Sequence, residues 1–298
     1  MIRWMMVALT SLLFAFSTPL SAAPRDKKAE KRANTRLLRW FMLSLDQSQL
    51  EFLKRSQKDS LKREKMMELG KQIAQKLPDA SRDEFVSSLD KYSKTLSAQV
   101  SEDVLYQQYQ NMRLATYKHF KVARIPSQNP SLTLGAEVYK AHCSTCHGVN
   151  GRGDGVLAQN KKFPMKPGPG DLQMLGEQGY RSPVSYHNTL LLGSPGTSMP
   201  SFAKRLSNHE AWSVAFYLVS DQFWGVEQHG STKSASSLKM SEKLPARFLS
   251  LEFLATRSDT DMRLEFEKSG ISDLRNQINI LRNRELERLS VPRKSFVK

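Results

Sequence analysis

Five consecutive residues, Cys143-Ser144-Thr145-Cys146-His147, constrain this 298-residue chain more than any other stretch. Two thiols three positions apart, followed at once by an imidazole, match the attachment sequence of a c-type haem. In that arrangement the thiols form thioethers with the two vinyl groups of one haem, and the imidazole is the proximal ligand of the iron. The motif therefore predicts one covalently attached haem c, bound by Cys143, Cys146 and His147.

A Cys-x-x-Cys pair has three other roles: half of a structural zinc site, a thioredoxin-like redox pair and a plain disulfide. A four-ligand zinc site needs a second Cys/His pair at finger spacing, and the chain has only these two cysteines. A thioredoxin-like pair begins a helix after a strand. Here a turn-rich loop with four glycines, residues 148–155, follows His147. The motif in its context favours haem.

The first 23 residues have the pattern of a cleaved signal peptide. Arg3 supplies a positive charge, residues 5–16 are apolar, and Ser21-Ala22-Ala23 offers small residues for cleavage. The alternative is an uncleaved membrane anchor, but the apolar run is shorter than the roughly 20 residues that span a bilayer. We therefore expect a periplasmic protein, because c-type haem is attached outside the bacterial cytoplasm.

The positive charge of the chain is concentrated before the haem motif. Residues 24–125 hold 22 Lys and Arg against 13 Asp and Glu, whereas residues 126–225 hold 8 against 6. Such a basic region favours an acidic partner or peripheral contact with anionic lipid head groups. Export makes a nucleic acid partner unexpected.

Residues 24–125 show the apolar periodicity of amphipathic helices. Four helical stretches are predicted, at about residues 37–45, 61–77, 85–96 and 102–120. Pro78 ends one stretch, and the sequence Ser81-Arg82-Asp83-Glu84 is a capping box that predicts the start of the next. We expect an antiparallel four-helix bundle in which Met66 and Met67 fill the core.

A linker with two prolines near residues 123–132 leads into a domain predicted over residues 126–228. A helix over 134–142 enters the haem motif, and Ser207-Asn208-His209-Glu210 is a capping box before a closing helix at 211–219. This closing helix is expected to cross the 134–142 helix and to cover it with aromatic side chains.

The second axial ligand of the iron is predicted to be Met199. Pro200 prevents a helix through this residue, and a thioether is a soft ligand that raises the haem potential. His187 is the main rival, but it lies in a predicted helix where an ordinary histidine is expected. His142 is expected to lie outside the iron coordination.

In order along the chain, the sequences CSTCHG, GRGDG, GTSMPSF and WSVAFYL resemble those of class I cytochromes c over about residues 130–224. The resemblance implies that Cys143 and Cys146 hold the haem and that His147 and Met199 ligate its iron. It also implies an electron-transfer protein that cycles Fe(III) and Fe(II), in place of a bond-making catalyst. The alternatives are a haem enzyme or gas sensor with an open distal site, and a structural adaptor.

A narrower resemblance includes Arg181-Ser182-Pro183, the stretch 186–193 and the stretch 248–259. These are similar to the cytochrome module of bacterial fusion proteins in which it precedes a high-affinity iron permease. The permease itself and its R-E-x-x-E signature are missing from this chain. The resemblance implies a redox partner in a split iron-uptake permease system or another membrane complex, and the alternative is a general respiratory carrier.

The last part, residues 229–298, begins with a Ser/Lys-rich linker. A C-terminal helical hairpin is expected after it, with helices at about 247–268 and 272–289. This segment could be autonomous, a lid on the cytochrome domain or a docking surface, and packing within the chain is favoured. The whole chain is therefore predicted to be all-α, with an N-terminal helical bundle, a class I cytochrome c domain and a C-terminal helical segment.

Overall fold

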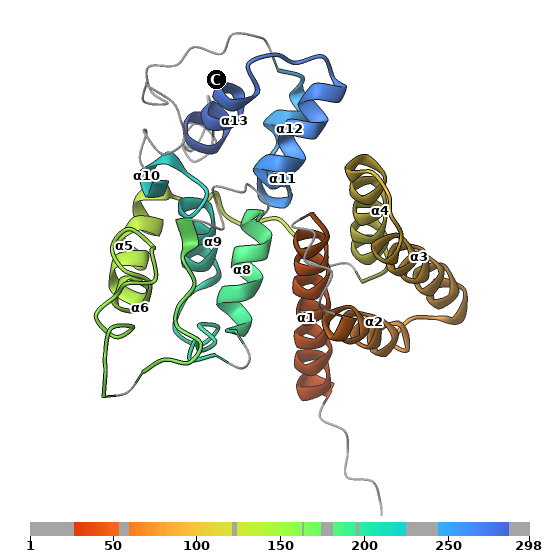
Figure 1. Ribbon diagram of the computed structural model, residues 1–298, viewed down its shortest axis with the longest axis horizontal. Helices are drawn as coiled ribbons and strands as arrows, with labels where there is room; N and C mark the ends of the chain where they lie inside the picture. The colour runs from red at the N-terminus through yellow and green to blue at the C-terminus, as the bar shows by residue number, and fades with distance from the viewer. Residues whose placement is uncertain are drawn as a thin grey trace, which may run out of the picture. The chain divides into compact units, whose positions relative to one another are not determined.

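A computed structural model of the chain describes residues 27–53, 60–120, 124–162, 164–173, 181–194, 197–224 and 244–285 (Figure 1). Every regular element in these ranges is a helix, which confirms the predicted all-α class. The chain divides into two compact units, residues 1–36 and residues 37–298. The signal peptide predicted at residues 1–23 lies outside the described residues. Within the described ranges, no helix has both the length and the apolar character needed to cross a membrane.

Among the residues that the structure describes, four helices precede the linker: α1 (Lys27–Leu53), α2 (Ser60–Ala74), α3 (Asp79–Ser97) and α4 (Glu102–Phe120). Helix α3 packs against both α2 and α4. Buried side chains from all four helices form one core, among them Phe41, Met66, Phe85, Leu89 and Met112. Met66 is fully buried, in agreement with its predicted role in the core.

Helix α3 begins before the predicted capping box at residues 81–84, so that prediction was wrong. The first helical residue is Asp79, and the carbonyl of Pro78 accepts a hydrogen bond from the backbone N–H of Arg82 at 2.8 Å. The Arg82 side chain donates to the carbonyls of Ala74 and Leu77 at 3.3 and 2.9 Å. The proline and the turn that ends α2 therefore fix the start of α3, and Ser81 lies inside its first turn.

The middle of the chain contains α5 (Leu132–His142), α6 (Ser144–His147), α8 (Pro183–Leu192), α9 (Asn208–Tyr217) and α10 (Asp221–Trp224). The predicted capping box of Ser207 and Glu210 is present at the start of α9. Helices α5 and α9 pack closely against each other (Figure 1). At Gly135 there is no room for a side chain, because an added Cβ would meet the Ser213 carbonyl oxygen and lie 2.7 Å from the Tyr217 Cβ.

The C-terminal segment is more divided than predicted. Its described elements are the 3-10 helix η2 (Ala246–Leu249), α11 (Leu251–Thr256), α12 (Asp259–Lys268), α13 (Leu274–Ile280) and the π-helical turn η3 (Leu281–Glu285). The helix predicted over 247–268 is interrupted because Ser250 and Ser258 each cap a new helix, accepting hydrogen bonds from the backbone N–H groups of Phe253 and Asp261. The end predicted for the second helix, residues 286–289, lies outside the described residues.

One hydrophobic core joins the middle of the chain to the C-terminal segment. It contains Leu190 and Phe216 together with Phe248, Phe266 and Leu281, all buried. Two of these rings, Phe248 and Phe266, pack against Phe253, the first tilted and the second stacked, and they meet each other edge to face. The C-terminal segment is therefore packed within the chain and is not an autonomous hairpin.

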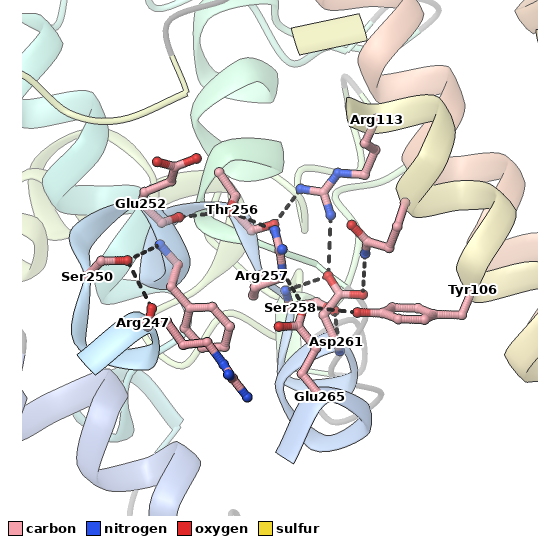
Figure 2. Close-up of polar contacts among 12 residues, drawn as sticks. Tyr106, Arg113, Arg247, Ser250, Glu252, Thr256, Arg257, Ser258, Asp261 and Glu265 are labelled. Atoms are coloured by element: carbon pink, nitrogen blue, oxygen red, sulfur yellow. Dashed lines mark hydrogen bonds and ion pairs between the residues drawn. The ribbon is translucent and has the colours of Figure 1, made fainter. Parts of the chain in front are cut away.

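Polar contacts join α4 to the turn between α11 and α12 (Figure 2). The Arg113 guanidinium forms an ion pair with Asp261, with 3.4 Å between Nη1 and Oδ2, and donates a hydrogen bond to the Thr256 carbonyl. The Tyr106 hydroxyl donates to Glu265 at 3.2 Å beside this pair. The α11–α12 turn, residues 254–261, thus receives side chains from α4.

Candidate haem site

The two cysteines lie on a tight turn at the end of α5. The backbone N–H groups of Cys146 and His147 both donate to the Cys143 carbonyl, at 3.1 and 2.9 Å, so α6 begins directly after the first thiol. Both thiols are free; Cys143 is buried and Cys146 is partly exposed. Burial raises the pKa of the Cys143 thiol to about 12, with a smaller contribution from Cys146. Both side chains line the same cavity.

His147 is held in one orientation by a backbone carbonyl. Its Nδ1 lies 3.3 Å from the Gly170 carbonyl oxygen. Because a carbonyl can only accept, Nδ1 carries the hydrogen, and the lone pair of the neutral ring is on Nε2. Burial also lowers the pKa of His147, although the bond to Gly170 opposes this effect. A neutral imidazole fixed through its other nitrogen is the usual form of a metal-binding histidine.

The glycine-rich loop after His147 folds back over the cysteine turn. The backbone N–H groups of Gly153 and Gly155 donate to the carbonyls of His147 and Cys146, at 2.8 and 3.2 Å. Gly148 has a φ of 80°, a conformation that side chains disfavour, and an added Cβ there would meet the Asp154 carboxylate. The loop therefore braces the turn that carries both thiols.

The cavity beside this turn has a volume of about 270 Å³. Cys143, Cys146 and His147 line it together with Met199, and most of its remaining wall is apolar, including Leu190, Phe202, Val214 and Leu218. Two free thiols, a neutral imidazole with an available Nε2, a thioether and an apolar wall are the groups that a covalent haem requires. The residues present fit haem c.

Met199 lies in a non-helical loop, as the sequence predicted. Its backbone N–H donates to the Thr197 hydroxyl at 3.1 Å, and its carbonyl accepts from the backbone N–H of Ser194 at 3.1 Å. Gly193, with a φ of 75°, approaches the same stretch so closely that a Cβ there would lie 2.8 Å from the Met199 carbonyl oxygen. These contacts hold the loop at the cavity.

The rival ligand His187 does not line the cavity. It is buried in α8, where its Nε2 lies 3.1 Å from the Asn208 side-chain oxygen. Its ring stacks on Trp212, with centroids 4.0 Å apart and an interplanar angle of 13°. Burial, helped by the charge of Arg39, lowers the pKa of His187 to about 3. His187 is therefore a neutral packing residue.

Three polar residues at the cavity were not assigned a role there by the sequence analysis. His142 lines the cavity, and its expected place outside the iron coordination stays a prediction. Arg181 and Tyr186 also line it, with the Arg181 guanidinium 5.5 Å from the centre of the Tyr186 ring. Both lie in the stretches that resemble the cytochrome module of iron-permease fusion proteins, a resemblance that gave neither of them a role at the cavity.

Comparison with known families agrees with this geometry. The family described as Cytochrome c matches residues 132–222. These residues form a class I cytochrome c domain. The domain implies covalently bound haem c and an electron-transfer role, as the CSTCH motif predicted. In bacteria, cytochrome c domains are typically periplasmic or extracellular.

The helical regions on both sides of the cytochrome domain lie outside this match. No curated protein matches the chain. Among solved structures, a chain of the reducing HAO-like protein complex of Kuenenia stuttgartiensis is 29% identical, over 37% of this chain and 58% of that chain, with a TM-score of 0.27. The match therefore spans less than two thirds of that relative.

Proposed function

We propose that this protein is a periplasmic monohaem cytochrome that transfers single electrons through a haem ligated by His147 and Met199. The observation that carries the ligand assignment is that His147 and Met199 line one cavity. The rival His187 instead contacts Asn208 and Trp212. The periplasmic location is supported by the signal-peptide pattern of residues 1–23.

Bound haem c supplies a one-electron Fe(III)/Fe(II) couple. The residues of the chain hold and tune this group. The Gly170 carbonyl keeps the hydrogen of His147 on Nδ1, which would leave the Nε2 lone pair available to bind the haem iron. A soft thioether from Met199 would favour the reduced iron, and apolar residues such as Phe202 and Leu218 line the cavity.

The ligand assignment is tested with Met199→Ala and, as a matched control, His187→Gln, which keeps a hydrogen-bonding side chain near Asn208. We expect Met199→Ala to abolish the near-infrared sulfur-to-iron charge-transfer band of the ferric protein and to lower the reduction potential. The control should retain the band. The reverse pattern in the two variants would contradict His/Met ligation and favour two histidines.

We further propose that the redox partner is a membrane complex for ferrous-iron uptake. This rests on the resemblance of residues 181–193 and 248–259 to the cytochrome module of iron-permease fusion proteins. In this role, Fe(II) at the partner would be the one-electron donor, and haem c held by Cys143, Cys146, His147 and Met199 would supply the acceptor. The basic excess of residues 24–125 supports docking on acidic groups of the partner or of lipid head groups.

Deletion of the gene should then impair growth when ferrous iron is limiting, and Met199 or His147 variants should reproduce the defect. A respiratory defect with normal growth under iron limitation would favour a general electron carrier. Full iron uptake by a haem-ligand variant would favour an adaptor. Association with membranes should weaken at moderate salt, because the contact is between exposed charges.

A further inference from the structure

Arg282 is among the largest fully buried side chains, with 2% of its surface exposed, yet it lies 60 residues beyond the end of the family match at residue 222. Its guanidinium makes three short contacts. Nε lies 2.9 Å from the Asp259 carboxylate, Nη1 donates to the Leu254 carbonyl at 2.7 Å, and Nη2 donates to the Arg257 carbonyl at 2.6 Å. Arg282 therefore binds the end of α11 to the start of α12.

This interaction has a clear physical basis. The last carbonyls of α11 have no partner within the helix, and a cation at a helix C-terminus is favourable. The rigid fork of the guanidinium satisfies two carbonyls and a carboxylate at once. A buried arginine without these partners would be very costly, so the turn and Arg282 depend on each other.

The turn that Arg282 binds lies against the wall of the haem cavity. Helix α11 packs on α8, and Leu254 of α11 shares a core with Leu190 of α8. Leu190 and Tyr186, both on α8, line the cavity. Helix α8 thus lies between the C-terminal turn and the space that haem c would fill.

The charges of Arg282 and Asp259 act on the cavity wall. Burial raises the pKa of Tyr186 to about 12; Arg181 opposes this rise, Asp259 adds to it, and Arg282 opposes it. The Tyr186 side chain is buried, and charges in such surroundings are screened much less than charges in water. The pair outside the matched domain is therefore electrostatically coupled to a side chain inside it.

We propose that the Arg282–Asp259 pair belongs to the haem site: Arg282 is a positioning residue that holds α8 and Tyr186 at the cavity, and the two charges set the haem potential. The proposal rests on the proposed function, because it requires a redox-active haem. It assigns to the C-terminal segment a role in the electron-transfer domain itself.

Charge substitutions give opposite expectations for the two partners. Loss of a cation near the haem stabilises the ferric state relative to the ferrous state, because the ferric iron carries one more positive charge. In Arg282→Met the ferric-to-ferrous ratio, measured at the midpoint potential of the unmutated protein, should therefore rise severalfold. In Asp259→Asn the same ratio should fall. If the substitutions only loosened the fold, the ferric-to-ferrous ratio would change in the same direction in both variants.

The measurement is a spectroelectrochemical titration of the full-length protein, after mass spectrometry has shown one haem per chain. Arg282→Lys separates charge from positioning: we expect a lower melting temperature but a smaller change in the ratio than in Arg282→Met. The matched control is Arg263→Met on α12, which breaks only an exposed pair with Glu267 and should leave the ratio unchanged.

Shifts of the same sign in Arg282→Met and Asp259→Asn, or no shift in either, would overturn the proposal. If Arg282→Met does not fold, Asp259→Asn alone decides, since the Asp259 side chain is 27% exposed and its loss leaves the carbonyl contacts of Arg282 in place. Absence of haem from the unmutated protein contradicts the proposed function and is detected separately by its mass.

Discussion

Arg113 on α4 and Asp261 on α12 form an ion pair across 148 residues of sequence, with their side chains only 4% and 3% exposed. Asp261 also accepts from the backbone N–H of Ser258 at 2.9 Å, as part of the capping box of α12. One carboxylate therefore serves both the start of a helix and the contact between two parts of the chain (Figure 2).

Asp261→Ala should lower the free energy of unfolding by about 3–5 kcal/mol, because it leaves the buried Arg113 guanidinium without its charge partner. Urea denaturation followed by circular dichroism measures this change. The control Glu267→Ala breaks an exposed pair with Arg263 and should cost less than about 1 kcal/mol. Equal losses in the two variants would contradict the importance of the buried pair.

Acid should destabilise the protein through His187. Its pKa of about 3 in the folded protein lies below the ordinary value of 6.5, so the folded state favours the neutral ring. The contribution of the neutral His187 ring to the free energy of unfolding is complete well above pH 6.5, and it is lost as the pH falls from 6.5 towards 3. Between pH 7 and pH 5 the loss should be about 2 kcal/mol. His187→Phe keeps an aromatic ring on Trp212, so urea denaturation should show a smaller loss in its free energy of unfolding between pH 7 and pH 5. If the variant loses as much as the unmutated protein, groups other than His187 cause the acid destabilisation.

Gly135→Ala should destabilise the protein by about 1–3 kcal/mol, although alanine is the better helix former. The added methyl group would meet the Ser213 carbonyl and the Tyr217 Cβ, and so would force α5 and α9 apart. Thermal unfolding and haem content should both be recorded. Gly168→Ala is the control for unfolding, because no atom beyond its chain neighbours lies within 4 Å of its added Cβ. A Gly135→Ala protein as stable as the unmutated one would refute the close crossing.

The mature protein should retain one haem through denaturation and acid extraction, because thioether bonds survive both. Mass spectrometry should find the haem on Cys143 and Cys146, and the Cys143→Ser/Cys146→Ser double variant should carry no covalent haem. His142→Ala should still carry it. Free thiols or a disulfide in the mature wild-type chain would refute attachment.

Local signals predicted the parts of the site that depend on local chemistry. The CSTCH turn, the Ser207–Glu210 capping box and the loop position of Met199 each follow from a few adjacent residues, and all are present in the structure. The capping box of Ser258 and Asp261 could have been found in the same way, since its S-x-x-D spacing is visible in the sequence. Without it, the C-terminal segment was predicted to have two long helices.

Buried charges could not be predicted in this way. Arg113 and Arg282 are charged residues on helices, and periodicity assigns such residues to a solvated face. Their burial depends on partners 148 and 23 residues away, at Asp261 and Asp259. Arg181 and Tyr186 were missed at the cavity for the same reason, because contacts made by the fold carry no signal in the local sequence.

The shared core has a consequence for the order in which the chain can fold. The core of the four N-terminal helices closes with Met112, so it is complete once about 120 residues are available. The core behind the haem cavity includes Leu281, and the buried Arg282 follows directly. In a chain that folds from its N-terminus, both thiols therefore come more than a hundred residues before the residues that finish the wall behind α8. During that interval the cavity has its attachment residues but lacks its rear support, which leaves it open for the cofactor to enter.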